Sequence, residues 1–215
     1  MIPLYHDFTG ETVLVFGGGP VGARKARRFV REAAVVVVSP AFSEADYGAA
    51  QRVRASPSPD DVDSWIDRVD PALVVAATDD EDVNEAVERA ASERGVLVNR
   101  ADRAGGRDVG SVVVPATVRD GDVVVSVSTS GSSPALSREL RSRIESEVRG
   151  AGEMASLTAD VREELKASGV EPAARRAAIR ELVRSEWVWK GLGTGSAKAR
   201  RRADAVVEAA LGEHE

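Results

Sequence analysis

The chain begins with short apolar runs that alternate with amphipathic stretches. Runs rich in β-branched residues at 12–16, 34–39, 73–77 and 96–98 have the length of strands, and a shorter one is centred on Val53. Between these runs, apolar residues recur at helical spacing over about 21–31, 62–66 and 83–91. Strands that alternate with helices form parallel sheets covered on both faces. The first hundred residues are therefore predicted to form a Rossmann-like, doubly wound α/β fold.

The pattern changes after Gly105-Gly106. Two apolar runs at 112–114 and 123–127 flank Asp120-Gly121, a dipeptide typical of hairpin turns. The sequence therefore predicts a two-stranded hairpin here, and residues 135–148 are predicted to form the helix that follows it.

From Gly150 onward the apolar spacing is helical throughout. It predicts three helices at about 154–165, 172–189 and 196–211. We expect a Rossmann domain, a small α+β region and a helical C-terminal domain, with boundaries at 1–110, 111–150 and 151–215.

A glycine motif joins the first strand to the first helix. Gly17, Gly19 and Gly22 have the spacing G-x-G-x-x-G, in which the glycines allow a tight turn, close approach of a pyrophosphate and close helix packing. Pro20 and Val21 begin the helix, whose N-terminal N–H groups favour phosphate. A glycine-rich turn that binds nothing is the alternative, but the strands and the helix around the motif favour a dinucleotide such as NAD.

Two other strand ends are predicted to complete the cofactor site. Ser39 ends the second strand, where dinucleotide folds usually place an acidic residue for the ribose. No arginine follows it to accept a 2′-phosphate, so we expect NAD rather than NADP. Thr78 and Asp79 follow the apolar run at 73–77 and are expected beside the cofactor, although Asp79 or Asp80 would also suit a helix cap.

The segment Thr129–Pro134 precedes the predicted helix at 135–148 and is rich in hydroxyl groups and glycine. Such a segment forms either an anion-binding nest or an ordinary serine cap. The local sequence leaves both open.

The amino-acid composition excludes several kinds of functional site. The 215 residues are 43% hydrophobic but only 4% aromatic, carry a net charge of −6 and include no cysteine. Thiolate metal sites and cysteine nucleophiles are thereby excluded, and nucleic acid is not an expected partner. With no apolar run of membrane-spanning length and no signal-peptide pattern near the first residue, we expect a cytoplasmic protein.

Several segments together resemble the precorrin-2 dehydrogenase family, which includes the N-terminal part of siroheme synthase. The resemblance covers about residues 2–150 in order, and the C-terminal helices match only loosely. The stretch S-T-S-G-S-S-P-A-L at 128–136, leading into an arginine-bearing helix, is its most specific part. The matching segments are 17–25, Ala77–Asp80 with Asn84, Val98-Asn99 with Asp102, Val114–Ala116 and 127–136 with Arg138 and Arg141.

The resemblance implies NAD-dependent oxidation of precorrin-2 to sirohydrochlorin, by a homodimer whose interface is built from the hairpin and the following helix. It also implies that Asp102 is the essential aspartate, which would accept a proton as hydride leaves the macrocycle. Some members also insert ferrous iron, a role that stays open here. The family often has a proline soon after this aspartate, whereas here Arg103-Ala104-Gly105-Gly106 follows. With only two histidines and no cysteine, no resident metal site is expected.

The substrate implied by the resemblance carries many carboxylates, which pair well with arginine. Thr129, Ser130 and Ser132 are expected to contact it at the head of the helix. The arginines considered for its carboxylates are Arg100, Arg103, Arg119, Arg138 and Arg141, of which we select Arg100 and Arg138.

Two other functions fit parts of the sequence. NAD-binding regulatory modules of potassium transport share the A-T-D-D-x-x-x-N pattern of Ala77–Asp80 and Asn84, but they generally have an acidic residue where Ser39 stands. A short-chain oxidoreductase would need a Tyr-x-x-x-Lys pair. Thr9 follows Tyr5 and Gln51 follows Tyr47 at that spacing, so this class is disfavoured.

Overall fold

The computed structural model describes residues 2–102, 111–192 and 196–212. The chain divides into two compact units, which are described separately. Unit 1 consists of Met1–Val114 with Ser130–Ser132, and unit 2 consists of Pro115–Thr129 with Ser133–Glu215. None of the described helices is long and apolar enough to cross a membrane.

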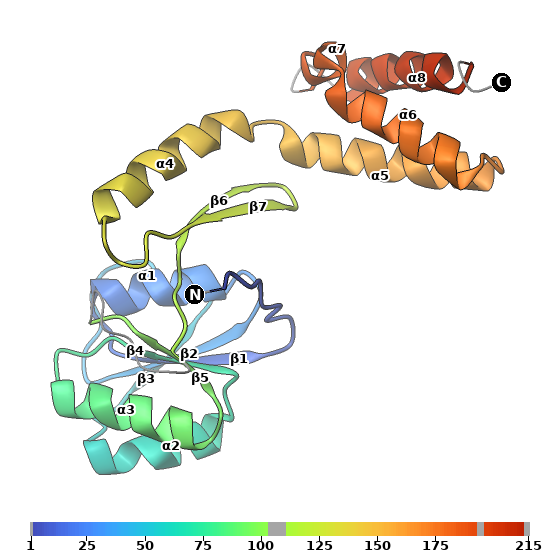
Figure 1. Ribbon diagram of the computed structural model, residues 1–215. Helices are drawn as coiled ribbons and strands as arrows, with labels where there is room; N and C mark the ends of the chain where they lie inside the picture. The colour runs from blue at the N-terminus through green and yellow to red at the C-terminus, as the bar shows by residue number, and fades with distance from the viewer. Residues whose placement is uncertain (1, 103–110, 193–195, 213–215) are drawn as a thin grey trace. The chain divides into compact units, whose positions relative to one another are not determined.

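Unit 1 contains a five-stranded parallel sheet with the strand order β3-β2-β1-β4-β5 (Figure 1). The order reverses beside β1, as in a doubly wound fold, and this reversal opens a crevice at the carboxyl ends of the strands. The predicted Rossmann-like class is therefore confirmed. The strands are β1 (Thr12–Phe16), β2 (Ala34–Ser39), β3 (Gln51–Arg54), β4 (Leu73–Ala76) and β5 (Leu97–Arg100).

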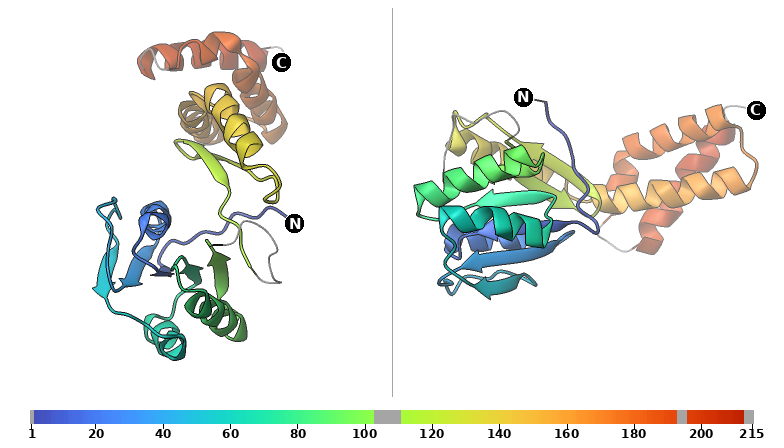
Figure 2. Two further views of the ribbon diagram at one scale, coloured as in Figure 1. Left: turned by 90° about the vertical axis from the view of Figure 1, so that its left-hand side faces the viewer. Right: turned by 90° about the horizontal axis from the view of Figure 1, so that it is seen from below.

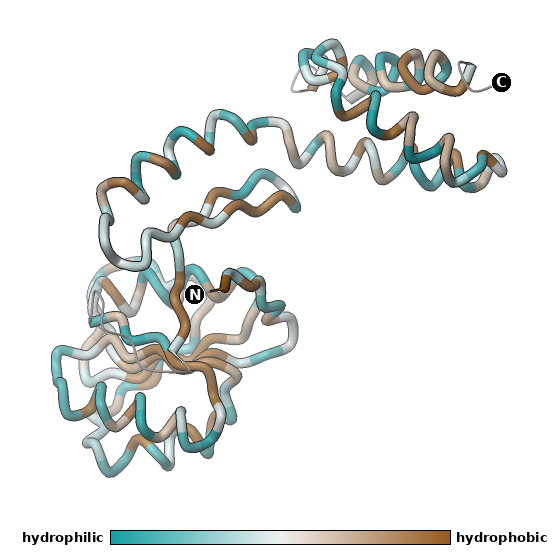
Figure 3. The backbone as a smooth tube through the Cα atoms, viewed as in Figure 1, coloured by the Kyte–Doolittle hydropathy of each residue, from teal (hydrophilic) through white to brown (hydrophobic). Residues whose placement is uncertain are grey.

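Helices cover both faces of this sheet (Figure 2). Val13 and Val15 of β1 pack with the residues of α1, whereas Leu14 and Phe16 pack toward the other helices. The central strands are buried on both faces, which is why they read as continuous apolar runs and appear brown in Figure 3. The helices are α1 (Pro20–Phe29), the short 3₁₀ helix η1 (Pro59–Asp61), α2 (Val62–Val69) and α3 (Glu81–Glu93).

Unit 2 begins with the hairpin of β6 (Ala116–Asp120) and β7 (Val123–Val127), which packs against α4 (Pro134–Glu147). The prediction that residues 112–114 form the first hairpin strand is wrong. A two-residue turn pairs Asp120 directly with Val123, and this register carries the partner strand back only to Ala116.

The rest of unit 2 is helical, with a core of its own that includes Met154 and Leu182. The predicted long helix at 172–189 is wrong in one respect, because it ends at Arg184. Ser185 adopts an extended conformation there, and its hydroxyl accepts a hydrogen bond from the Val188 N–H, so that a new short helix begins. The four helices are α5 (Ala151–Ala167), α6 (Pro172–Arg184), α7 (Glu186–Trp189) and α8 (Ser196–Gly212).

Candidate active site

A cavity of about 550 Å³ lies at the carboxyl edge of the sheet in unit 1. This is the position where open α/β sheets bind their ligands. All the residues predicted to bind the cofactor, except Gly22, line it. Gly22 is instead buried in α1. The lining consists of Gly17, Gly18, Gly19, Pro20, Val21, Val38, Ser39, Pro40, Ala41, Phe42, Ser43, Ser56, Pro57, Ala77, Thr78, Asp79, Asp80 and Val83.

The glycines of the motif act in different ways. Gly17 has φ +113°, and a Cβ there would lie 2.2 Å from the carbonyl oxygen of Ala77, while a Cβ on Gly22 would lie 1.9 Å from the carbonyl oxygen of Gly17. Both are therefore needed for the fold itself. A Cβ on Gly19 would meet no atom of the chain within 4 Å. Since Gly19 lines the cavity at the N-terminus of α1, where no side chain caps the helix, it keeps a cradle open for a pyrophosphate. The residues present thus fit NAD.

Sequence reasoning did not identify the loop that closes the cavity beside β2. The Tyr47 side chain is buried, and its hydroxyl donates a hydrogen bond to the carbonyl oxygen of Gly18. Phe42 packs edge-on against the Tyr47 ring at 5.8 Å between centroids. A Cβ on Gly18 would lie 2.3 Å from the Ala41 carbonyl oxygen, so this glycine lets the loop approach the motif. No local pattern marks Tyr47, because its partner lies 29 residues away.

The opposite wall is held by Asn84, which is buried in α3. Its side-chain oxygen accepts hydrogen bonds from the Thr78 N–H (3.2 Å) and hydroxyl (2.8 Å), and its amide donates to the Thr78 carbonyl (2.9 Å). Asp80 is the N-cap of α3, accepting hydrogen bonds from the N–H groups of Asp82 and Val83. Of the two aspartates considered for a cap, Asp80 therefore has that role, whereas Asp79 is exposed at the cavity.

Ser39 lies at the end of β2, is nearly buried and lines the cavity, where it replaces the usual acidic residue. Its partner in the adjacent strand is Arg54, whose guanidinium donates to the Pro40 carbonyl at 3.4 Å. No arginine follows Ser39 closely in the sequence, yet strand pairing brings one beside this end of β2.

Asp102 follows β5 at the same sheet edge and belongs to an ion-pair network centred on Arg100. The Arg100 guanidinium binds Asp102 through both carboxylate oxygens, at 2.9 and 2.6 Å. It also contacts Glu88 at 2.7 Å and Glu81 at 3.0 Å. The Arg100 side chain is only 4% exposed. We expected Arg100 to meet substrate carboxylates, but in this structure its guanidinium is held by three carboxylates of its own chain.

This network sets the protonation state of Asp102. Partial burial raises the pKa of the carboxyl group, but the hydrogen bonds from Arg100 and from the backbone outweigh burial, and the net pKa lies below its usual value of 3.8. The same contacts raise the pKa of Arg100. Asp102 is therefore an oriented anion near neutral pH.

Asn99 precedes Arg100 in β5 and is also buried. Its side-chain oxygen accepts a hydrogen bond from Lys25 of α1 at 2.7 Å, and its amide donates to the Val112 carbonyl at 2.7 Å. Asn99 thus ties the returning segment at 111–112 to the sheet, beside the strand that carries Asp102.

The predicted substrate residues fall in both units, so each is described within its own. In unit 2 the Thr129 hydroxyl donates to the Ser133 carbonyl and accepts from the Ser133 N–H, while the Ser133 side chain caps α4. Ser130 and Gly131 are consecutive residues with positive φ, and Ser132 follows them. Arg138 is exposed on α4. Arg141 donates to the Thr117 carbonyl at 3.2 Å, and Arg103 lies outside the described residues.

Among the residues that the structure describes, no group of three or more histidine, cysteine, aspartate or glutamate side chains could hold a metal ion. The three carboxylates around Arg100 are instead bound to its guanidinium.

Two family descriptions match the chain. "Putative NAD(P)-binding" covers residues 4–116, and "Sirohaem biosynthesis protein central" covers residues 120–147. A solved structure titled SirC, precorrin-2 dehydrogenase, superposes with a TM-score of 0.70 at 22% identity, covering 97% of this chain and 100% of that one, so it has the same fold.

Curated relatives extend the similarity along the whole chain. The precorrin-2 dehydrogenase of Methanosarcina barkeri is 33% identical over 98% of this chain and 95% of its own length. The siroheme synthase of Stutzerimonas stutzeri is 34% identical over 99% of this chain but only 46% of its own length. The regulatory module of potassium transport is therefore not favoured. The cavity and these matches show that the chain is an NAD-binding member of the precorrin-2 dehydrogenase and siroheme synthase family.

Proposed function

We propose that this chain oxidises precorrin-2 to sirohydrochlorin with NAD as hydride acceptor, as a step toward siroheme. The observation that carries the proposal is an ionised, oriented Asp102 at the same sheet edge as a cavity shaped for a dinucleotide. The M. barkeri relative, which this chain matches over nearly its full length, bears the name of this activity.

The residues of unit 1 have two proposed roles, which are binding of the cofactor and transfer of a proton. Gly17, Gly19 and the first turn of α1 receive the pyrophosphate, and Ser39, Thr78 and Asp79 line the remainder of the cavity. NAD supplies the acceptor for the hydride. Asp102 accepts the proton that the macrocycle loses, and Arg100 holds its carboxylate in one orientation through two hydrogen bonds. Because the pKa of Asp102 is lowered, the acceptor is ionised throughout the neutral range.

The proposed substrate contacts lie near the start of α4. Ser130 and Ser132 flank a glycine with positive φ, a backbone geometry suited to carboxylate oxygens. Thr129 orders this turn through its bonds to Ser133, and the exposed Arg138 supplies a cation one turn into the helix. Arg100 is a positioning residue in this proposal, because it orients the Asp102 carboxylate that accepts the proton.

We also propose that the chain is a cytoplasmic homodimer with β6, β7 and α4 at its interface. No residue of α4 is buried although the helix carries Leu136, Leu140 and Ile144, and Leu136 is 49% exposed. A two-stranded hairpin with one helix has little core of its own, which is why a second copy would stabilise it. Size-exclusion chromatography with light scattering would give the mass of a dimer, or that of a monomer if this proposal is wrong.

The experiment combines enzymatically generated precorrin-2, NAD and the purified protein under anaerobic conditions. NADH and sirohydrochlorin are expected to form together. Asp102→Asn should lower kcat by about 10²- to 10⁴-fold, since it removes the proton acceptor. Asp60→Asn is the matched control and should retain most activity, since Asp60 is an exposed aspartate of unit 1 that lies outside the cavity lining. NAD binding without formation of NADH or sirohydrochlorin would refute the proposal. Ferrous ion added to the same reaction would test metal insertion.

A further inference from the structure

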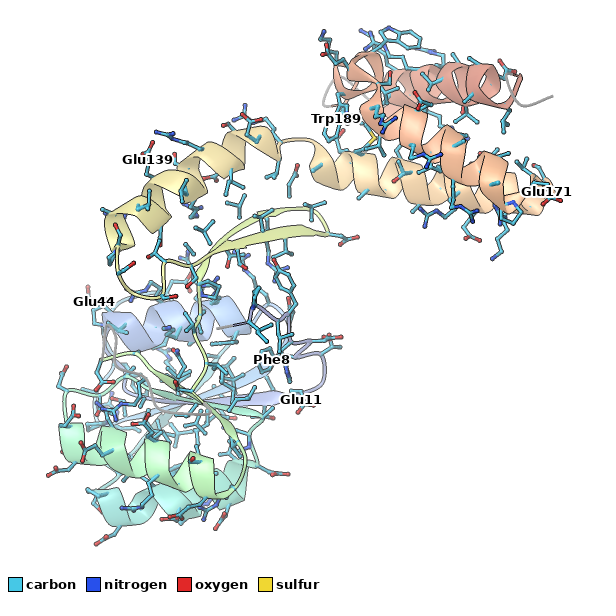
Figure 4. The ribbon with its side chains drawn as sticks, viewed as in Figure 1. Phe8, Glu11, Glu44, Glu139, Glu171 and Trp189 are labelled. Carbon is cyan, nitrogen blue, oxygen red and sulfur yellow. The ribbon has the colours of Figure 1, made fainter. Side chains whose placement is uncertain are left out.

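The hairpin of α5 and α6 carries a second cavity, of about 560 Å³, whose charged lining is mostly cationic. The two helices pack side by side and are joined beside Glu171, which is labelled in Figure 4. In a chain of net charge −6, this concentration of positive charge requires a local reason. The charged residues that line the cavity are Arg162, Glu163 and Lys166 of α5 and Arg175, Arg176 and Arg180 of α6.

The arginines of this cavity have no anionic partner among the described residues. Over residues 2–102, 111–192 and 196–212, the structure gives the four guanidinium groups no hydrogen bond or ion pair. Lys166 pairs with Glu163 at 3.5 Å. Elsewhere in the same unit, Arg184 pairs with Glu181 at 3.4 Å and Arg200 binds Asp204 at 2.8 Å. Carboxylates are therefore common in this unit but are not directed at the cavity arginines.

The arrangement is unfavourable for the helices themselves. Arg162 and Lys166 are four residues apart on α5, as are Arg176 and Arg180 on α6, and like charges at this spacing repel. Arg175 and Arg176 also lie near the positive end of α6, where Glu171 is the N-cap residue but the first turn has no acidic residue. A bound anion would relieve both effects. Helix stability thus does not explain the cluster, whereas anion binding does.

We propose that this cavity binds the carboxylates of the tetrapyrrole, an inference that rests on the proposed function. The guanidinium fork matches a carboxylate in shape and charge. Five cations from two packed helices line a cavity of about 560 Å³, which can take more than one carboxylate of a macrocycle. Among the residues that the structure describes, none that lines this cavity is aromatic and could stack on a base, which argues against nucleic acid. The site therefore takes a polycarboxylate macrocycle.

The test uses uroporphyrin, an air-stable tetrapyrrole with eight carboxylates, titrated into the 215-residue protein and followed by porphyrin fluorescence. In the double variant R162Q/R176Q, Kd is expected to rise about five- to tenfold, since two charge-assisted contacts are lost. The matched control R184Q removes an arginine of α6 that already has a partner and should leave Kd unchanged. A single-stranded DNA oligonucleotide of similar charge should compete poorly.

An unchanged Kd for uroporphyrin in R162Q/R176Q, or an equal rise of Kd in R184Q, overturns the proposal that this cavity is the binding site. Equal competition by the oligonucleotide overturns the tetrapyrrole assignment. NAD-dependent oxidation of precorrin-2 is measured on the same proteins. Activity without cavity-dependent binding refutes this inference alone, whereas cavity-dependent binding without activity refutes the proposed function alone.

Discussion

Replacing Arg100 by methionine tests the ion-pair network most directly. The Arg100 side chain is 4% exposed, and the side chains of its partners Asp102 and Glu88 are only 17% and 16% exposed. Methionine has a similar length but no charge. The carboxylates of Asp102 and Glu88 would then lie close to each other and to the half-exposed Glu81 with no cation to offset their charges. Breaking a buried pair by removing one partner costs about 3–5 kcal/mol of unfolding free energy, and we expect a loss of that size at pH 7.

The loss should depend on pH in a defined direction. In the wild type, the folded-state pKa of Asp102 is lowered, so its contribution to stability is present above the unfolded pKa and is lost as pH falls through the folded value. In the variant, Asp102 loses the cation that lowers its pKa, so the repulsion among the carboxylates is relieved and stability recovers as pH falls. The difference between the two proteins is therefore expected to be largest at pH 7 and to shrink by pH 4.5.

The measurement is urea unfolding followed by the fluorescence of Trp65, which lies in α2 of unit 1. Trp187 and Trp189 are replaced by phenylalanine in every protein, so that unit 2 does not contribute to the signal. The matched control is Arg94→Met, because Arg94 also pairs with two carboxylates but is 28% exposed, with partners 42% and 63% exposed. Arg94→Met should lower the unfolding free energy by about 1 kcal/mol or less. Equal losses in the two variants, or a loss that does not vary with pH, would refute the reasoning.

Three further predictions concern the same unit. In the dehydrogenase assay, Arg100→Met should move the acidic limb of the kcat profile to higher pH, because Asp102 loses the cation that lowers its pKa. Gly19→Ala should fold normally, since its Cβ meets no chain atom, but calorimetry should show NAD binding weakened at least about tenfold as the methyl group enters the cradle. Asp80→Ala should lower the unfolding free energy of unit 1 by about 1 kcal/mol in urea titrations, through loss of the α3 cap.

The sequence by itself determined the strands, helices and motif of unit 1. Buried parallel strands must be apolar on both faces, so β1, β2 and β4 are visible as runs of valine, leucine and alanine. The G-x-G-x-x-G spacing was equally informative, because the structure shows direct steric reasons for Gly17 and Gly22. These features depend on local periodicity and on backbone sterics, which a sequence displays.

Tertiary structure decided which side chains meet. The hairpin register depends on a turn that pairs Asp120 with Val123, and the long helix predicted at 172–189 is divided by a single serine cap. Arg54 reaches the end of β2 through strand pairing, and Tyr47 reaches Gly18 across 29 residues.

Arg100 illustrates the physical reason most clearly. The family resemblance led us to expect a cation that contacts substrate carboxylates, whereas α3 brings Glu81 and Glu88 to the Arg100 guanidinium and the side chain is buried. A charge is buried only where partners converge, and that convergence depends on the packing of a helix against a strand rather than on any local pattern. The sequence therefore predicted most of the residues that line the cavity, and the tertiary structure decided how Asp102 at the same sheet edge is charged and held.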